Sequence, residues 1–489
     1  MEPLLEFNRI TFALPGRQFV INSSVTVNES LPKVTEFVLR LIRLCDGIEP
    51  EQIRDYFGFA SNETKIILDS LVNEQLIRIE DGIAKLTPYA ADKFNETADE
   101  LPRFSVVKER TDTVDFDLLT FHPVDGRSGL FNPENMVELA LSSENIGSST
   151  RLAEHAYQKH FQRILRIKER TQDRIDIYKI SDVRSKRLFF LPVVARITLN
   201  TTAEIVREID YPEDAPEEFR LGIDTAVSDR LKRPLGVQQL LLEEFVERFD
   251  DKVIGQFLSK KGLDFARYVQ SVFVEKSVTY SGTTQPVLGN LYMPNNRDII
   301  LDWVKSSFSG ERVGAPDDQR LQTSIAWLAP DYPFWGRSSL LDILIESAET
   351  ALPRPQKPRK KYNERVHLLY PAEQSATRTA TNQFRGTKEK SLHFYSGEVM
   401  GGRVEVFMVP TRFACVLFHF APPGNSAAFV PMGFITRNPE LMKEAQVIIM
   451  ESAAHGNAYL GPATFKKEDE KGPNQTFLEQ FSFLNYCSA

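Results

Sequence analysis

The runs Ile325-Ala-Trp-Leu-Ala-Pro330 and Ser338-Ser-Leu-Leu-Asp-Ile-Leu-Ile-Glu-Ser-Ala-Glu349 open the segment that decides the fold. The first run is short and apolar, and the second has apolar residues at helical spacing. An aromatic turn over residues 331–336 separates them, and another short apolar run, residues 365–371, follows the helix. A strand, a crossover helix and a second strand in this order form a βαβ unit with parallel pairing.

Further strand-like runs follow this unit and predict a mixed sheet. They are Ser391–Tyr395, Arg403–Val409, Ala414–Phe420, Phe429–Thr436 and Gln446–Glu451. We therefore expect one domain over residues 324–465. The polar and aromatic segment 466–489 is expected to be a C-terminal tail that docks back onto the body.

The order of these elements resembles one half of a phospholipase D-like domain, and Phe429-Val-Pro-Met-Gly-Phe-Ile-Thr-Arg-Asn438 stands where that family carries a glycine-serine-x-asparagine turn. The family's catalytic histidines lie in a His-x-Lys motif, because phosphoryl transfer needs a neutral imidazole beside a fixed cation. The residues two positions after the seven histidines are Val124, Tyr157, Gln162, Leu369, Tyr395, Ala421 and Asn457. None is lysine, so the resemblance implies the fold and argues against this catalysis.

Two other kinds of chemistry remain open in this domain. His419 lies in an alternating apolar run, and His393 and Glu405 belong to neighbouring candidate strands. If these strands are adjacent, the three side chains form a cluster for metal binding or general acid–base catalysis. A lone strand histidine is more often a hydrogen-bonded core residue. Thr436 and Asn438 of the turn phrase are candidates for holding a phosphate without cleaving it.

Residues 33–97 predict three helices and a hairpin. A helical apolar stripe ends at Asp46-Gly47, a short helix begins at Pro50, and a third helix begins at Ser61. Two short strands then flank Asp81-Gly82, a dipeptide typical of a hairpin turn. Three helices and a hairpin in this order resemble a winged-helix domain.

The third helix of such a domain reads the DNA major groove in one interpretation. The candidate residues are Asn62 and Lys65 on the helix, with Arg78 and Lys85 on the wing. A groove reader normally carries more cations than acids, because phosphate neutralisation supplies most of the affinity. Here acids are as frequent as cations, so contact with a protein is an equal alternative.

Residues 148–172 predict an amphipathic helix with a basic stripe, which would suit a phosphate backbone or an acidic partner. The stripe consists of Arg151, His155, Lys159, Arg163, Arg166 and Arg170. The alternative is a surface helix whose cations are solvated or paired with Glu154 and Glu169. A proline-rich basic loop over residues 352–361 is a second candidate, with Arg359, Lys360 and Lys361 as phosphate contacts or as plain solvated residues.

The rest of the chain divides into three expected regions. Residues 1–32 predict a β-hairpin arm that turns at Pro15-Gly16. Residues 98–235 predict an α/β region, which one interpretation makes a degraded first half of the phospholipase D-like fold. Residues 236–323 predict a helical region. The fold class is therefore α+β or α/β and multidomain: an N-terminal winged helix, then a mixed-sheet phospholipase D-like body with a helical insertion.

Composition narrows the classes of function. The 489 residues carry a net charge of −8, so any nucleic-acid contact must use local patches. The three cysteines are widely spaced, which indicates a reducing compartment and no structural zinc. A signal peptide and a membrane span are both absent from the pattern, so we expect a cytoplasmic protein. With no P-loop, dinucleotide fingerprint or metal-ligand spacing, we expect no cofactor.

Three functional hypotheses follow. A winged helix beside a phospholipase D-like fold without its motif suggests, by fold-level analogy, a non-catalytic subunit that helps a larger complex hold DNA. Prokaryotic anti-phage and restriction systems use such combinations, with catalysis in a partner ATPase or nuclease. The alternatives are a protein–protein adaptor without direct DNA binding, which the negative charge favours, and a divergent phospholipase D-fold nuclease or hydrolase.

Overall fold

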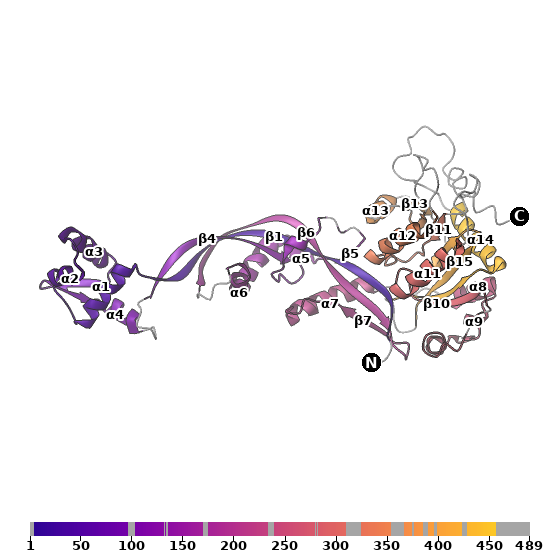
Figure 1. Ribbon diagram of the computed structural model, residues 1–489, viewed down its shortest axis with the longest axis horizontal. Helices are drawn as coiled ribbons and strands as arrows, with labels where there is room; N and C mark the ends of the chain where they lie inside the picture. Colours follow the sequence, from indigo (N-terminus) through magenta and orange to yellow (C-terminus); the bar gives the residue numbers. More distant parts are fainter. Residues whose placement is uncertain are drawn as a thin grey trace, which may run out of the picture. The chain divides into compact units, whose positions relative to one another are not determined.

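The protein has an α+β architecture with several sheets. The computed structural model describes residues 4–95, 103–131, 133, 135–169, 175–232, 239–278, 280, 282–309, 324–353, 366–373, 376–384, 390–395, 399–422 and 428–455. The chain divides into two compact units (Figure 1). Unit 1 comprises Met1–Pro15, Arg127–Leu141 and Phe189–Ala489, and unit 2 comprises Gly16–Gly126 and Ser142–Leu188.

A seven-stranded mixed sheet forms the centre of unit 1, in the order β10-β16-β15-β14-β11-β12-β13. The strands are β10 (Thr284–Leu288), β11 (Ile325–Leu328), β12 (Val366–Pro371), β13 (Lys390–Tyr395), β14 (Val404–Val409), β15 (Phe413–Phe420) and β16 (Val430–Thr436). Strands β11, β12 and β13 pair in parallel, and the remaining neighbours pair antiparallel. Helix α12 (Ser339–Ala351) lies between β11 and β12 in the chain, which confirms the predicted βαβ unit.

Helices cover both faces of this sheet. On one face, α8 (Gln239–Phe249) packs Phe245 against Phe418 of β15, and α14 (Pro439–His455) contacts β14 and β15. On the other face, α11 (Pro294–Ser307) sets Trp303 against Phe413 of β15, and α12 lies beside α11. Every residue of β14, β15 and β16 is therefore buried, as is usual for strands covered on both sides.

Two predictions about this domain are corrected. The run Gln446–Glu451 is part of helix α14 and not a strand. Its buried residues recur at helical spacing along α14, and the Asn438 side chain accepts a hydrogen bond from the backbone N–H of Glu440 at the helix start. The domain also begins before residue 324, because β10 and α11 from the expected helical region 236–323 belong to the sheet and its cover.

The expected N-terminal hairpin is instead one long strand, β1 (Leu5–Ser30). It pairs in parallel with β5 (Val137–Glu138) at Phe12 and Ala13, and antiparallel with β4 (Arg103–Asp117) from Gly16 onward. Pro15 stands where the partner changes. Because proline has no N–H, it leaves no unpaired donor at that point, so Pro15-Gly16 interrupts the ladder without turning the chain.

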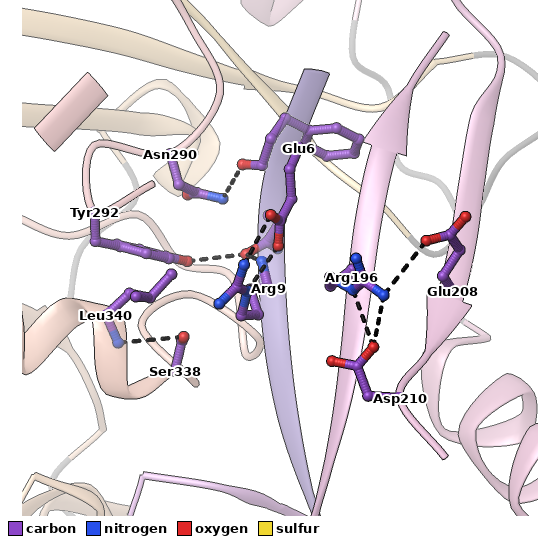
Figure 2. Close-up of polar contacts among 11 residues, drawn as sticks. Glu6, Arg9, Arg196, Glu208, Asp210, Asn290, Tyr292, Ser338 and Leu340 are labelled. Atoms are coloured by element: carbon purple, nitrogen blue, oxygen red, sulfur yellow. Dashed lines mark hydrogen bonds and ion pairs between the residues drawn. The ribbon is translucent and has the colours of Figure 1, made fainter. Parts of the chain in front are cut away.

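The first half of β1 is held in unit 1 by polar contacts (Figure 2). The Asn290 side chain donates to the Phe7 carbonyl at 3.0 Å, and the Tyr292 hydroxyl donates to the Asn8 side chain at 3.1 Å. Strand β6 (Ile175–Leu199) and β7 (Ile205–Ile209) pair nearby, where Arg196 meets Asp210 at 2.7 Å. The bonds of Asn290 and Tyr292 satisfy buried polar groups that would otherwise oppose folding, whereas the Arg196–Asp210 pair is exposed.

Unit 2 contains the second half of β1, with β4 and the start of β6. Helix α6 (Ser149–Glu169) lies along these strands (Figure 1), and its Tyr157 hydroxyl donates to Asp112 of β4 at 2.6 Å. The described ladders of region 98–235, β1–β4 and β6–β7, are antiparallel. Strands β4, β6 and β7 of this region share one sheet with β1, and its interpretation as half of a phospholipase D-like fold stays a prediction.

The three helices and the hairpin predicted for residues 33–97 are present in unit 2, between β1 and β4 in the chain, and we keep the name winged helix for this segment. It consists of α1 (Lys33–Leu44), α2 (Pro50–Phe57), α3 (Ser61–Asn73), β2 (Ile77–Glu80), β3 (Ile83–Leu86) and α4 (Pro88–Asn95). Its core includes Val38, Leu71 and Phe94. Asp81 and Gly82 both have positive φ, 52° and 79°, which is the geometry of the predicted two-residue hairpin turn.

The shorter elements complete the architecture. They are η1 (Gly126–Ser128), α5 (Ser143–Gly147), α7 (Glu217–Leu231), α9 (Lys252–Gly255), β8 (Leu258–Ser259), β9 (Gly262–Leu263), α10 (Phe265–Val269), the π-helix η2 (Gln270–Val274), α13 (Thr377–Gln383) and η5 (Val399–Gly402).

Gly433 in the middle of β16 provides a test of the sheet. A Cβ atom there would lie 2.1 Å from the Val416 carbonyl oxygen of β15, a backbone atom that cannot rotate away. We expect Gly433→Ala to lower the free energy of unfolding by more than the about 1–3 kcal/mol of ordinary overpacking. Chemical denaturation measures this, with Gly147→Ala, which meets no atom within 4 Å, as the control. Equal stability of both variants would contradict the register of β15 and β16.

Candidate functional site

Glu405 and His419 form a buried polar pair on the sheet of unit 1. Glu405 lies on β14 and His419 on the adjacent β15, with His419 Nε2 at 2.8 Å from Glu405 Oε2. Trp327 on β11 donates its indole N–H to the other carboxylate oxygen at 2.9 Å. An ionised carboxylate only accepts hydrogen bonds, so His419 Nε2 is the donor of the pair when Glu405 is charged.

Aromatic side chains surround this pair. The Tyr332 ring of the aromatic turn lies 6.5 Å from the His419 ring and 4.6 Å from Phe429. Trp335 stacks edge-on against Trp327 at 5.4 Å. The side chains of Glu405 and His419 have no exposed surface. A general acid or base must reach the atom it protonates, so the pair has the geometry of a structural core contact.

His393 does not join this pair, which corrects the predicted three-residue cluster. It lies on β13, and β11 and β12 separate that strand from β14. Its ring instead lies 5.7 Å from that of His367 on β12. Within the described part of the chain, no group of three or more His, Cys, Asp or Glu side chains is arranged to hold a metal ion.

Thr436 and Asn438 form hydrogen bonds within the fold. The Thr436 hydroxyl lies 2.7 Å from that of Thr284 on β10 and accepts the backbone N–H of Asn438 at 2.9 Å. The Asn438 side chain caps α14. Thr436 is fully buried, so the turn phrase joins β16 to α14 and offers no open hydroxyl to a phosphate.

The winged-helix candidates lie on the surface and in acidic surroundings. Asn62 and Lys65 are exposed on α3, and Lys85 is half-buried on β3. Arg78 on β2 is exposed and forms an ion pair with Glu80 at 3.2 Å. From Lys33 to Asn95 the domain has eight Lys and Arg against eleven Asp and Glu, a net charge of −3.

Helix α6 presents the predicted basic stripe to solvent. Arg151, His155, Lys159 and Arg166 are exposed, and Arg163 is half-buried. Arg151 also lies 3.7 Å from Glu144 of α5, and both side chains remain largely exposed. An exposed pair of this kind contributes little stability and competes weakly with other anions.

The opposite face of α6 anchors the helix. Ala153, Ala156 and Phe161 are buried, as is Tyr157, which is hydrogen-bonded to Asp112. Burial and the bond to Asp112 raise the pKa of Tyr157. Asp112 in turn forms an ion pair with Arg110 at 2.5 Å. The stripe is therefore carried by a helix whose orientation on the strands is fixed.

A second group of cations escaped the sequence prediction. Strand β6 runs unbroken from Ile175 to Leu199. This strand carries Lys179, Arg184, Lys186 and Arg187 as exposed residues within unit 2. The excess of Lys and Arg between residues 179 and 187 was the available signal. Arg170, Arg359, Lys360 and Lys361 lie outside the described residues.

Comparisons with known proteins give little guidance. No family model matches the chain, and no curated protein does. A crystal structure of phosphatidylserine synthase from Haemophilus influenzae Rd KW20 shares 11% identity and a TM-score of 0.23 over 50% of this chain and 60% of that one. TrmBL2, described as an archaeal chromatin protein with a novel mode of DNA binding, shares 6% identity and a TM-score of 0.19 over 85% of this chain and 89% of that one. At these scores neither protein informs the function. Among the described helices, none is both long and apolar enough to span a bilayer.

Removing one member of the buried pair should destabilise unit 1. His419→Leu leaves the Glu405 carboxylate buried with Trp327 as its remaining described donor, and we expect a loss of about 3–5 kcal/mol in the free energy of unfolding. Glu405→Leu combined with His419→Leu removes both polar groups and should cost less. All three tryptophans lie in unit 1, so their fluorescence reports its denaturation. A double variant less stable than the single one would contradict the pairing.

His367 and His393 should make unit 1 sensitive to acid. Burial lowers the pKa of His367 to about 4, and burial together with His367 lowers the pKa of His393 to about 3. The unfolded value is about 6.5, so the unfolded chain binds more protons between pH 6.5 and 4. The stabilising contribution of the two neutral histidines is therefore fully present above about pH 6.5. As the pH drops, the free energy of unfolding falls by up to about 1.4 kcal/mol per pH unit for each histidine.

Denaturation curves measured from neutral pH to about pH 4 test this dependence. We expect His367→Leu combined with His393→Leu to flatten the profile, and His155→Gln, at an exposed position of α6, to leave it unchanged. A profile that keeps its slope in the double variant would show that other groups cause the acid sensitivity.

Proposed function

We propose that this chain is a non-catalytic subunit that holds nucleic acid by its phosphate backbone, along the exposed face of α6. The observation that supports this most is the row of Arg151, His155, Lys159 and Arg166 on one side of a helix whose other side is anchored. A helix rises about 1.5 Å per residue, so the row extends for roughly 22 Å. Cations arranged over this length suit several successive phosphates and no particular base sequence.

The local charge supports the same assignment. The segment Ser142–Leu188 has eleven Lys and Arg against six Asp and Glu, although the whole chain is negative. The exposed cations of β6 belong to the same unit. Binding that depends on phosphate neutralisation needs such a local excess and not a basic protein overall.

The winged helix is better suited to contact with a protein than with DNA. The protein–protein adaptor hypothesis is therefore kept for this domain. Its net charge of −3 opposes a phosphate backbone. Ile66 on α3 and Ile79 on the wing are exposed by 61% and 46%, where a groove reader would carry cations. We propose that this domain joins the chain to the other subunits of a complex, with catalysis in a partner ATPase or nuclease. A prokaryotic anti-phage or restriction system is the proposed setting, by fold-level analogy.

Fluorescence anisotropy with labelled double- and single-stranded DNA, across a salt series, tests the role of α6. We expect Lys159→Glu with Arg166→Glu to weaken binding and to reduce the slope of log affinity against log salt by about 0.9 for each lost phosphate contact. Lys65→Glu with Arg78→Glu makes the same charge change on the winged helix and should leave the slope unaltered.

Two outcomes would contradict the proposal. A larger loss in the winged-helix variant would place the nucleic-acid contact on α3 and the wing. An absence of binding at low salt would exclude stand-alone nucleic-acid binding by either region. The same samples with divalent metal added report cleavage, and any cleavage that His419→Leu abolishes without unfolding the chain would restore the hydrolase hypothesis.

A further inference from the structure

Helix α1 of the winged helix carries two apolar stripes, and the fold uses only one of them. Val38, Leu39 and Ile42 face the domain core and are almost fully buried. Val34, Phe37 and Leu44 lie on a different side of the helix and are exposed by 46%, 49% and 86%. Single exposed apolar side chains are common on proteins, whereas a row of them along one helix is a candidate binding surface.

The spacing of the second stripe is that of a helix–helix seam. The exposed members lie at positions 34, 37 and 44, separated by three and seven residues, and Leu41 between them is buried. Separations of three and seven residues are those by which one helix packs against another along a narrow apolar line. Ile66 and Val72 of α3 are also exposed, but a separation of six residues places them on different sides of their helix.

Charge along the stripe selects the occupant. Lys33 and Arg40 flank it, with side chains exposed by 83% and 38%, and both share the carboxylate of Glu36 at 3.8 and 3.4 Å. Two cations on one carboxylate leave this flank positive, on a domain whose net charge is −3. Charges beside an apolar seam determine which helix pairs with it, because like charges across the seam repel.

We propose that the stripe of Val34, Phe37 and Leu44 docks an amphipathic helix of another protein, whose apolar line is flanked by Asp or Glu. A second copy of this chain fits less well. In an antiparallel two-fold pairing each flank faces itself, so Lys33 and Arg40 would meet the same cations of the other copy. The inference is independent of nucleic-acid binding by α6, because it concerns a different surface and a different class of partner.

Binding of a synthetic peptide to the full-length protein tests the surface. The probe is a labelled peptide of a few heptads with Leu at the seam positions and Glu at the flanking positions, and the comparison peptide has Lys in place of Glu. We expect anisotropy to detect the Glu peptide and to show much weaker binding of the Lys peptide. Affinity for the Glu peptide should fall with salt, because charge contributes to it.

Variants locate the contact. Phe37→Ser with Leu44→Ser should weaken binding of the Glu peptide by at least about tenfold, because two buried apolar anchors are lost. Lys33→Glu should weaken it by a smaller factor through repulsion, and Leu221→Ser, which changes an exposed apolar residue of α7 outside the winged helix, should have no effect. All altered side chains are exposed, and circular dichroism checks that the variants fold.

Three results would overturn the proposal. If the Glu peptide does not bind, or both peptides bind equally, the stripe does not select an acidic helix. If Leu221→Ser weakens binding as much as the α1 variant, the binding is nonspecific. If sedimentation shows a dimer that Phe37→Ser with Leu44→Ser dissociates, the occupant is a second copy of the chain.

Discussion

The backbone hydrogen bonds of β1 are the constraint on which the organisation of this protein depends. A strand of 26 residues must pair along its length: β6 is a hydrogen-bonded neighbour of β1 in the same sheet, and a second neighbour of β1 changes at Pro15. Before Pro15 it pairs with β5 in unit 1, and from Gly16 it pairs with β4 in unit 2. One uninterrupted strand thus belongs to two compact units. A loop at Pro15 would have marked the boundary between the two units in the sequence. A proline within a continuous strand gives no such mark.

The polar atoms of the buried Glu405–His419 pair in the core of unit 1 also need hydrogen-bond partners. Taking a carboxylate out of water is costly, and the attraction between the two groups compensates only when the remaining lone pairs are also satisfied. Trp327 supplies that further bond from the next strand. The arrangement links β11, β14 and β15 by diagonal contacts, because Trp327 lies opposite Phe407 and Glu405 lies opposite Leu417. A polar residue within an apolar strand run can therefore indicate a core contact as well as a catalytic group, and burial distinguishes the two.

The accuracy of sequence interpretation differed between elements for physical reasons. The runs that became β11 to β16 were predicted well because both of their faces are buried and apolar residues accumulate in short segments. Val447, Ile448 and Ile449 made the same local pattern within α14, because periodicity over six residues cannot separate a buried helix from a strand. Pro15-Gly16 was interpreted as a turn, since the change of partner that explains it involves residues 103–138. His393 was grouped with Glu405 because the order of strands in a sheet does not follow from their order in the chain.

The distribution of charge gives the two candidate surfaces of unit 2 different roles. A net charge of −8 describes neither of them, because α6 and the start of β6 carry an excess of cations while the winged helix carries an excess of acids. A phosphate backbone is repelled by the second surface at the distances over which charges act in physiological salt, about 8 Å. Within the winged helix, the positive flank of α1 is then a local exception. This positive flank lies beside an exposed apolar stripe. The favoured partner is therefore a helix that carries both an apolar line to cover the stripe and acidic side chains to attract the flank.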